Sequence, residues 1–304
     1  MIVITRFDNT GRCQNKNANI QKLTCMSSFD SLDILFIGNS YCYSGINTAC
    51  FDSAGIRTFN LGVSSCGVNF YRLLVNDYLH SVKVKPKSVF ILVSPMILCF
   101  RSDDAMNNPI YRYMNEPVSN EKYIFTYDLE LLKSYPKICA RSFSRAIVGT
   151  YSRFTSKKNF CESENEMYKT KGFIPSNVVN SLKNELKTNH FYTPLLKDNF
   201  NSERANKLLF LAEELQKQNI EPVFYELPSN KLYTFFNDEY IRDYHGFLEA
   251  LKLKYTYMFA DVKPGLDKYR DQDHLNTSGS VMACRKLIEL IKSDPHLNEM
   301  YFGL

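Results

Sequence analysis

Five short apolar runs along the chain constrain the fold more than any other feature of the sequence. Each run is nearly continuous in hydrophobic residues and rich in β-branched and aromatic side chains, rather than alternating apolar with polar ones. This pattern is typical of parallel strands that are covered on both faces. The runs are "DILFIGN" (33–39), "IRTFNLGV" (56–63), "SVFILVS" (88–94), "EPVFYELP" (221–228) and "YTYMFADV" (255–262).

The segments between these runs have helical periodicity. In "NFYRLLVNDYLHSV" (69–82) and "SERANKLLFLAEELQKQN" (202–219), apolar residues recur every three or four positions and so share one helical face. Strand, helix and strand therefore follow one another repeatedly. This order predicts a doubly wound α/β fold, with a parallel sheet of about five strands and right-handed crossovers.

Residues 101–200 interrupt this rhythm. The stretch is polar and aromatic, contains several prolines and has only partial helical patterns, such as "YDLELLKSY" (127–135). We interpret it as a helical insertion between the third and fourth strands, close to the strand carboxyl ends, where ligands bind in open α/β sheets. It is a candidate lid. Residues 1–28 are polar and predict an N-terminal extension, which leaves 29–304 as a single domain.

Composition and charge exclude several classes of protein. The net charge of +5 comes from 37 basic and 32 acidic residues without a run of five or six like charges, so nucleic acid is not an expected partner. The four-residue apolar stretch before Arg6 is too short for a signal peptide. No stretch reaches the roughly 18 apolar residues of a membrane span. We therefore expect a soluble, cytoplasmic protein.

The sequence predicts neither a metal site nor a cofactor site. The nine cysteines are an odd number, include no CxxC pair and lie partly within apolar runs, which favours buried thiols over disulfides or a zinc site. The histidines lack a metal-ligand spacing such as HExxH. The segment "GVSSCG" (62–67) lacks both the spacing and the lysine of a P-loop.

The first apolar run ends abruptly in Gly38-Asn39-Ser40, which makes the role of Ser40 the first functional question. If this run is the first strand, Ser40 lies at its carboxyl end and at the start of the next helix. Such a serine is either an N-cap, whose hydroxyl accepts from helix N–H groups, or a nucleophile whose own N–H lies where negative charge is favoured. This segment alone favours the cap.

A second polar stretch changes this balance. The segment "DKYRDQDHLNTSGS" (267–280) follows the fifth run and precedes an amphipathic helix. Asp271 precedes His274 by three residues, a spacing that lets the carboxylate bind one imidazole nitrogen while the other faces the sheet edge. Asp273 is the alternative partner, although we expect its side chain to point away. Loops after the first and fifth strands leave the same edge of a parallel sheet, so Ser40 and His274 can meet.

Three short blocks, in this order along the chain, resemble the SGNH or GDSL hydrolase superfamily. They are Ser40 within "FIGNS", the "FNLGVSS" turn after the second run, and "DQDHLNTSG" near the C-terminus. The resemblance implies a flavodoxin-like three-layer fold, with Ser40 as nucleophile, His274 as general base and Asp271 as its partner. It also implies an oxyanion hole that uses the backbone N–H groups of Ser40 and Ser65, together with the turn at Gly62.

The third block departs from the family pattern. Where the family has Gly-x-Asn-Asp, this chain has "LVSPMILCF" (92–100), which supplies no asparagine as an oxyanion donor. Ser94 and Asn69 are the candidates to replace it. A degenerate third block and the ending "DHLN" are most similar to bacterial proteins that add or remove acyl groups, usually acetyl, on cell-surface polysaccharides.

These features predict a serine esterase or acyltransferase that acts on O-acyl groups of a carbohydrate, above all O-acetyl groups, through an acyl-serine intermediate. Its partners would be an acylated carbohydrate or polysaccharide and, for transfer, an acyl donor. The missing asparagine leaves a catalytically weak carbohydrate-binding or assembly protein as an alternative. A lipid or thioester hydrolase is a third reading, disfavoured by the mixed charged and aromatic character of 101–200.

Overall fold

The computed structural model contains a sheet of five parallel strands, at the positions that the apolar runs predict. The strands are β2 (Ile34–Gly38), β3 (Thr58–Gly62), β4 (Ser88–Leu92), β6 (Glu221–Glu226) and β7 (Thr256–Phe259). Their order across the sheet is β3-β2-β4-β6-β7, which is the flavodoxin-like order. The structure describes residues 2–5, 18–64, 66–99, 124–127, 166–179, 199–229, 236–271 and 273–303.

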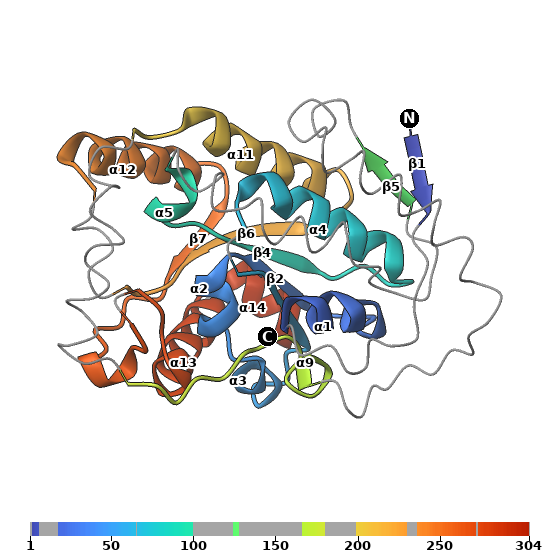
Figure 1. Ribbon diagram of the computed structural model, residues 1–304, viewed down its shortest axis with the longest axis horizontal. Helices are drawn as coiled ribbons and strands as arrows, with labels where there is room; N and C mark the ends of the chain where they lie inside the picture. Colours follow the sequence, from blue (N-terminus) through green and yellow to red (C-terminus); the bar gives the residue numbers. More distant parts are fainter. Residues whose placement is uncertain are drawn as a thin grey trace.

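Helices cover both faces of this sheet, so the predicted α/β fold of three layers is confirmed. In Figure 1, one layer lies above the sheet and consists of α4 (Val68–Ser81), α11 (Ser202–Gln216) and α12 (Asp238–Lys252). The layer below contains α3 (Thr48–Asp52), α13 (Thr277–Ser293) and α14 (Pro295–Phe302). The helices predicted over 69–82 and 202–219 are α4 and α11.

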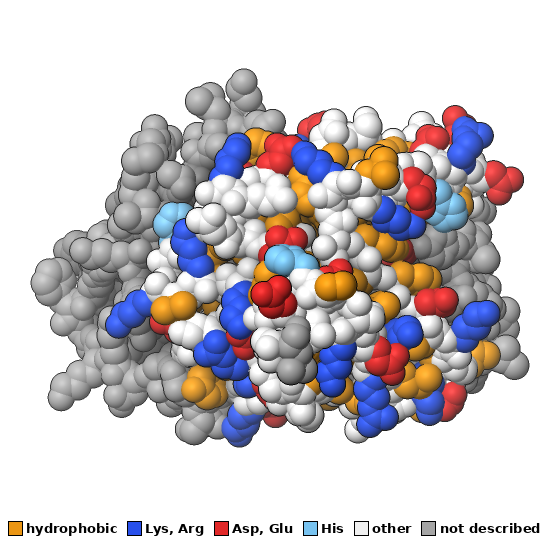
Figure 2. Space-filling model, turned by 180° about the vertical axis from the view of Figure 1, so that it is seen from behind, with side chains coloured by type: hydrophobic (Ala, Val, Ile, Leu, Met, Phe, Trp, Pro, Cys, Tyr) orange, Lys and Arg blue, Asp and Glu red, His pale blue; other side chains and the backbone are white. Residues whose placement is uncertain are grey.

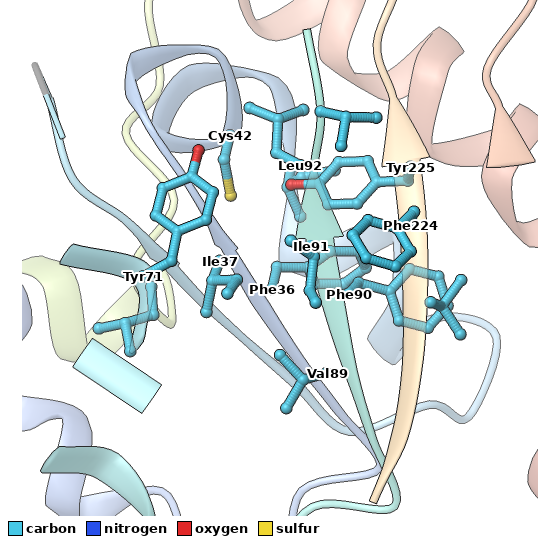
Figure 3. Packing of buried hydrophobic residues seen from close by; sticks show 14 of the residues in the cluster. Phe36, Ile37, Cys42, Tyr71, Val89, Phe90, Ile91, Leu92, Phe224 and Tyr225 are labelled. Atoms are coloured by element: carbon cyan, nitrogen blue, oxygen red, sulfur yellow. The ribbon is translucent and has the colours of Figure 1, made fainter. Parts of the chain in front are cut away.

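Aromatic side chains from the three central strands form the middle of the core (Figure 3). The ring of Phe36 in β2 lies 5.1 Å from that of Phe90 in β4 and 5.5 Å from that of Tyr225 in β6, between centroids. Phe51 of α3 packs on Phe36 at 4.9 Å. All four side chains are buried. Burial of each such side chain is worth about 1.5–3 kcal/mol, so these contacts hold the strands and α3 in fixed positions.

Residues 18–28 pack into the core, although the sequence predicted a polar extension over 1–28. The helix α1 (Ala18–Cys25) and the 3₁₀ helix η2 (Met26–Ser28) bury Leu23, Cys25 and Met26. The apolar residues of this short segment stand among polar neighbours and form no long amphipathic pattern, so the sequence did not reveal this packing. Nearer the N-terminus, β1 (Ile2–Thr5) pairs antiparallel with β5 (Ile124–Tyr127), as Figure 1 shows.

The insertion predicted between the third and fourth strands falls between β4 and β6. Within 101–200 the structure describes β5, residues 166–179 with α9 (Glu166–Lys169), and residues 199–200. Most of the candidate lid, including nearly all of the helical pattern over 127–135, lies outside the described residues. The division of the chain into an extension, a domain and a lid stays a prediction.

The described residues show the surface charges, the apolar character of the helices and the state of the cysteines. On the face seen in Figure 2, basic and acidic side chains are interspersed rather than gathered by sign. Within the described ranges, no helix has the length and apolar character that crossing a membrane requires. Six cysteines lie among the described residues, all of them thiols, and every one except Cys50 is buried.

The end of β3 lies so close to the helix of residues 40–45 that we can predict the effect of adding a side chain at Gly62. A Cβ atom at this position would lie 2.5 Å from the backbone nitrogen of Tyr43 and 2.8 Å from Cβ of Cys42. We expect Gly62→Ala to lower the free energy of unfolding by about 1–3 kcal/mol, because backbone has to move. Urea denaturation measures this change.

Gly246 provides the matched control. It is exposed on α12, and a Cβ atom there meets nothing within 4 Å. Gly246→Ala should raise the free energy of unfolding by about 0.5–1 kcal/mol, because alanine is the better helix former. Equal stability of the Gly62→Ala variant and the wild type would contradict the packing described for β3.

Candidate active site

Ser40 begins the short helix α2 (Ser40–Gly45) directly after β2, but it is not the residue that caps this helix. The N-cap is Asn39, whose side-chain oxygen accepts the backbone N–H of Tyr41 at 3.0 Å. Asparagine and serine are both preferred caps, and here asparagine takes the position. The hydroxyl of Ser40 therefore remains available at the carboxyl edge of the sheet.

The loop after β7 brings His274 and Asp271 to this hydroxyl. Nε2 of His274 lies 2.7 Å from Oγ of Ser40, and Nδ1 lies 2.9 Å from Oδ1 of Asp271. The same Asp271 oxygen accepts the backbone N–H of His274 at 2.8 Å, which fixes the carboxylate beside Nδ1 of the ring. The structure thus joins the three residues that the sequence singled out, in the order hydroxyl, imidazole, carboxylate.

Charge and burial set the protonation of this chain of groups. Burial alone would raise the pKa of Asp271, but its hydrogen bonds with His274 hold that pKa well below the usual range. Burial would likewise lower the pKa of His274, yet the charge of Asp273 and the hydrogen bond to Asp271 raise it to about 9. The second oxygen of Asp271 lies 3.2 Å from Nε of Arg270, which gives the carboxylate a cationic partner on its other side.

Asp273 points toward the imidazole, not away from it as the sequence led us to expect. Its Oδ1 lies 2.7 Å from Nδ1 of His274, and its Oδ2 accepts the hydroxyl of Tyr41 at 2.6 Å. The reason is local: Oδ1 of Asp271 accepts the backbone N–H groups of both Asp273 and His274, an Asx-type turn that coils the loop around the ring. The ring of Tyr41 stacks on that of His274, with centroids 5.0 Å apart.

Asn60 of β3 fastens α2 to the sheet. Its side-chain amide donates to the carbonyl oxygens of Cys42 in α2 and of Ile46 at the C-cap of that helix, each at 2.8 Å. Its oxygen accepts the N–H of Gly62 at 2.9 Å. Gly62 was expected to contribute to an oxyanion hole, but its N–H is committed to Asn60, so its role here is structural. Ser65, the other expected donor in this turn, lies outside the described residues.

The buried amine of Lys22 supports the same turn from α1. It donates to the carbonyl oxygen of Gly62 and lies 4.7 Å from the centroid of the Tyr43 ring. Complete burial lowers the pKa of Lys22 to about 7. The sequence placed this lysine in the N-terminal extension, and no local pattern connects it with a turn 40 residues away.

A segment of the insertion ties α2 to the histidine loop. We call residues 170–178 the strap. Its Ile174 donates to the carbonyl of Tyr43 at 3.2 Å, three residues after Ser40. Its Ser176 exchanges backbone and side-chain hydrogen bonds of 2.8–3.0 Å with Thr277, three residues after His274. The strap therefore holds the serine and the histidine at a fixed separation, a role that the sequence did not show.

Ser94 is one of the two residues that the sequence suggested as replacements for the missing third-block asparagine. It follows β4 and precedes the short helix α5 (Pro95–Leu98). Its hydroxyl is buried and makes no hydrogen bond in the part of the chain that the structure describes. A buried hydroxyl without a partner costs about 1–3 kcal/mol, and such groups call for a functional explanation. The side chain of Asn69, the other candidate, lies outside the description.

One group of described side chains has the geometry to hold a metal ion. The ligand atoms of Asp271, Asp273 and His274 lie within 4.8 Å of one another. A metal at this point would bind Nδ1 of His274 and displace the proton that Nδ1 shares with Asp271. The hydrogen bond from Nε2 to Ser40 instead fits an imidazole that works as a base between hydroxyl and carboxylate.

No protein-family model matches the sequence, and no curated protein matches it either. Among solved structures, the chain resembles a GDSL-like lipase from Bacteroides thetaiotaomicron, with a TM-score of 0.43 and 10% identity, over 91% of this chain and 98% of that one. A carbohydrate acetylesterase family member from Sinorhizobium meliloti gives 0.34 and 8%, over 90% and 100% of the two chains. An acetyl xylan esterase from Butyrivibrio proteoclasticus gives 0.35 and 10%, over 88% and 65%. These likenesses are weak, so the geometry of the site carries the functional assignment.

The raised pKa of His274 makes a prediction about stability. Because the folded pKa of about 9 lies above the ordinary 6.5, the ring stabilises the fold fully below pH 6.5 and loses this contribution as the pH rises to about 9. A rise of this size corresponds to about 3 kcal/mol. The stability difference between the wild type and His274→Gln, from urea unfolding, should therefore shrink by about 3 kcal/mol between pH 6.5 and pH 9. The same pH dependence of the unfolding free energy in both proteins would contradict the raised pKa of His274.

Proposed function

We propose that this protein is a serine hydrolase of the SGNH type, which cleaves or transfers a carboxylic acyl group through an acyl intermediate on Ser40. One observation carries the proposal: Oγ of Ser40, the imidazole of His274 and the carboxylate of Asp271 form a continuous hydrogen-bonded chain. That arrangement lets a weak nucleophile react once the imidazole of His274 has lost its own proton, because the neutral base then accepts the proton of the hydroxyl.

The first half of the reaction forms the acyl-enzyme. Oγ of Ser40 attacks the ester carbonyl, its proton passes to Nε2 of His274, and the carbonyl electron pair moves to oxygen. Asp271 keeps the proton on Nδ1 and stabilises the imidazolium that results. The tetrahedral intermediate then collapses, the C–O bond of the ester breaks, and Nε2 returns the proton to the departing alcohol.

The second half repeats these steps with a new nucleophile. Water or an acceptor hydroxyl gives its proton to Nε2 of His274 and attacks the acyl carbon. The bond from this carbon to Oγ of Ser40 then breaks, Nε2 returns the proton to Oγ, and the carboxylic acid or the new ester leaves. Hydrolysis and transfer share every step up to the acyl-enzyme and differ only in whether the site orients an acceptor and keeps water out. The candidate lid predicted over 101–200, most of which lies outside the described residues, would decide between them.

Three donors are proposed for the oxyanion hole. The backbone N–H of Ser40 belongs to the first turn of α2, where helix N–H groups have no partner within the helix. Ser65 would contribute its backbone N–H. We assign the third position to the buried hydroxyl of Ser94, which follows the neighbouring strand and has no other hydrogen bond in the described structure. It would stand in for the asparagine of the family's third block.

The substrate we propose is an O-acyl ester, above all an O-acetyl ester of a carbohydrate, on the basis of the short blocks around Ser40 and His274. The carbohydrate acetylesterase and the acetyl xylan esterase, among the structures that the chain resembles, fit this choice. The ester and the alcohol it releases would be the protein's partners in the reaction.

A longer acyl chain is the second candidate, because one observation favours it. Val178, the last residue of the strap, and the next residue, Val179, are more than half exposed, and Leu266 is 43% exposed. The side chain of Asn276 donates to the carbonyls of Val178 and Asp267, so these apolar residues lie on one side of the histidine loop. Rates with p-nitrophenyl acetate and octanoate distinguish the two: a marked preference for octanoate would contradict the acetyl proposal.

Substitution of the nucleophile and the base tests the mechanism. Ser40→Ala and His274→Ala should each lower kcat/KM for p-nitrophenyl acetate by about 10³-fold to 10⁶-fold, because each removes a group that acts in the same step. The control is Ser278→Ala, an exposed serine in the first turn of α13, which should stay within about twofold of wild type. Activity that survives both active-site substitutions would overturn the proposed function.

The proposed role of Ser94 is tested separately. Ser94→Ala should lower kcat and kcat/KM together by about 10²-fold to 10³-fold, because the hydroxyl would bind charge that exists only in the transition state. Ser88, a buried serine at the opposite end of β4, is the matched control: Ser88→Ala should leave kcat unchanged. A Ser94→Ala variant with wild-type kcat would show that Ser94 does not bind the oxyanion.

A further inference from the structure

The imidazole of His274 lies against two carboxylates, where a catalytic triad uses one. Nδ1 is 2.9 Å from Oδ1 of Asp271 and 2.7 Å from Oδ1 of Asp273, while Nε2 faces Ser40. The hydrogen bond of the ring goes to Asp271, and the contact with Asp273 is an ion pair whenever the imidazole is protonated. Asp273 is also the more deeply buried carboxylate, with 3% of its side chain exposed against 27% for Asp271.

Tyr41 holds both the second carboxylate and the ring. Its hydroxyl donates to Oδ2 of Asp273 at 2.6 Å and so gives this buried carboxylate a hydrogen-bond partner. Its aromatic face lies nearly parallel to the imidazole, at an interplanar angle of 16°. Because Tyr41 directly follows Ser40 in α2, one side chain connects the nucleophile's helix with the base and with the buried carboxylate.

We propose that Tyr41 and Asp273 form a positioning pair for His274, in which Asp273 is a second anionic partner of the imidazole and Tyr41 fixes both groups. This inference deepens the proposed function and rests on it for its catalytic meaning. Neither residue reaches the reacting atoms: both act through His274. Asp273 shares its loop with Asp271, whereas Tyr41 comes from α2 and stacks on the face of the ring.

The charges around the ring fit this role. From its own loop the imidazole faces Asp271 and Asp273, and the guanidinium of Arg270 offsets one of these two charges through Oδ2 of Asp271. From α2 it faces the neutral side chains of Ser40 and Tyr41. One negative charge is left over, which the imidazolium neutralises when His274 takes up the proton of Ser40. Protonation of the ring is therefore strongly favoured.

Two consequences follow. First, His274 keeps its proton to a higher pH than a lone triad histidine, in line with its raised pKa of about 9, and activity rises with pH through that value. Second, Asp273 can take over when Asp271 is lost, because its oxygen already lies 2.7 Å from Nδ1. A triad with one carboxylate has no such reserve.

Imidazole titration by NMR tests the pair without any need for turnover. The chain has five histidines, and His274→Gln identifies the His274 signal by its loss. We expect the pKa of His274 to be about 9 in the wild type and to fall by at least 1 in Asp273→Asn, which keeps the side-chain shape. In Asp271→Asn, where Asp273 remains, the pKa should stay above 6.5, although burial would lower it. A His274 pKa that Asp273→Asn leaves unchanged, or one below 6.5 in Asp271→Asn, would overturn the pair.

Kinetics give the catalytic readout. The acid limb of kcat/KM should move to lower pH in Asp273→Asn by the same amount as the NMR pKa, a shift that a purely structural residue would not cause. Asp271→Ala should keep at least 10-fold more activity than the double variant with Asp273→Ala. Tyr41→Phe, which retains the ring, should keep more activity than Tyr41→Ala. Equal activity of Asp271→Ala and the double variant would contradict the reserve role.

The two readouts separate this inference from the proposed function. If Asp273→Asn lowers the His274 pKa, but neither the wild type nor any variant hydrolyses an ester, the positioning pair stands and the esterase proposal fails. If activity depends on Ser40 but the His274 pKa ignores Asp273, the esterase proposal stands and the pair is overturned. Asp271→Asn keeps the test decisive even if Asp273→Asn does not fold, because it leaves the buried carboxylate in place.

Discussion

The buried side chain of Asn60 is the interaction on which the rest of the site depends. It donates to two carbonyls at the end of α2 and accepts the N–H of Gly62, while its backbone N–H donates to Lys171 of the strap. With only six residues, α2 is far shorter than a helix that is stable by itself. The hydrogen bonds from β3 therefore fix the position of α2, and with it the position of Ser40, the first residue of that helix. The carbonyl that Lys22 binds belongs to the same turn, so a second buried polar group supports the same arrangement.

The parallel sheet places the two halves of the site together, and hydrogen bonds then fix their separation. Ser40 follows β2 and His274 follows β7, two strands that are not neighbours in the sheet. The strap bridges the loops through Ile174 and Ser176, and Tyr41 bridges them through Asp273. A serine and a base must stay within hydrogen-bond distance for proton transfer. The structure meets this demand with contacts from three segments far apart in the chain.

The fold could be predicted from the sequence because it depends on patterns that local sequence records. Buried parallel strands need continuous apolar runs, and all five runs became strands. The Asp271 and His274 spacing also predicted a local contact, which the structure shows. Asn60, Lys22, the strap and the inward direction of Asp273 could not be predicted. Each depends on individual polar contacts that leave no periodic signal, and several of these contacts, such as those of Lys22 with Gly62 and of Ser176 with Thr277, join residues distant in sequence. Asp273 turns inward because of a backbone turn around Asp271, which residue spacing alone does not specify.

The central claim is that His274 activates Ser40 as a nucleophile, and reaction with a fluorophosphonate measures this most directly. The probe needs no knowledge of the natural ester and leaves a stable adduct on an activated serine. Peptide mapping by mass spectrometry after labelling at pH 9 should locate one adduct on Ser40, lost in His274→Ala while the protein remains folded. An unlabelled Ser40, or labelling that does not depend on His274, would contradict the account.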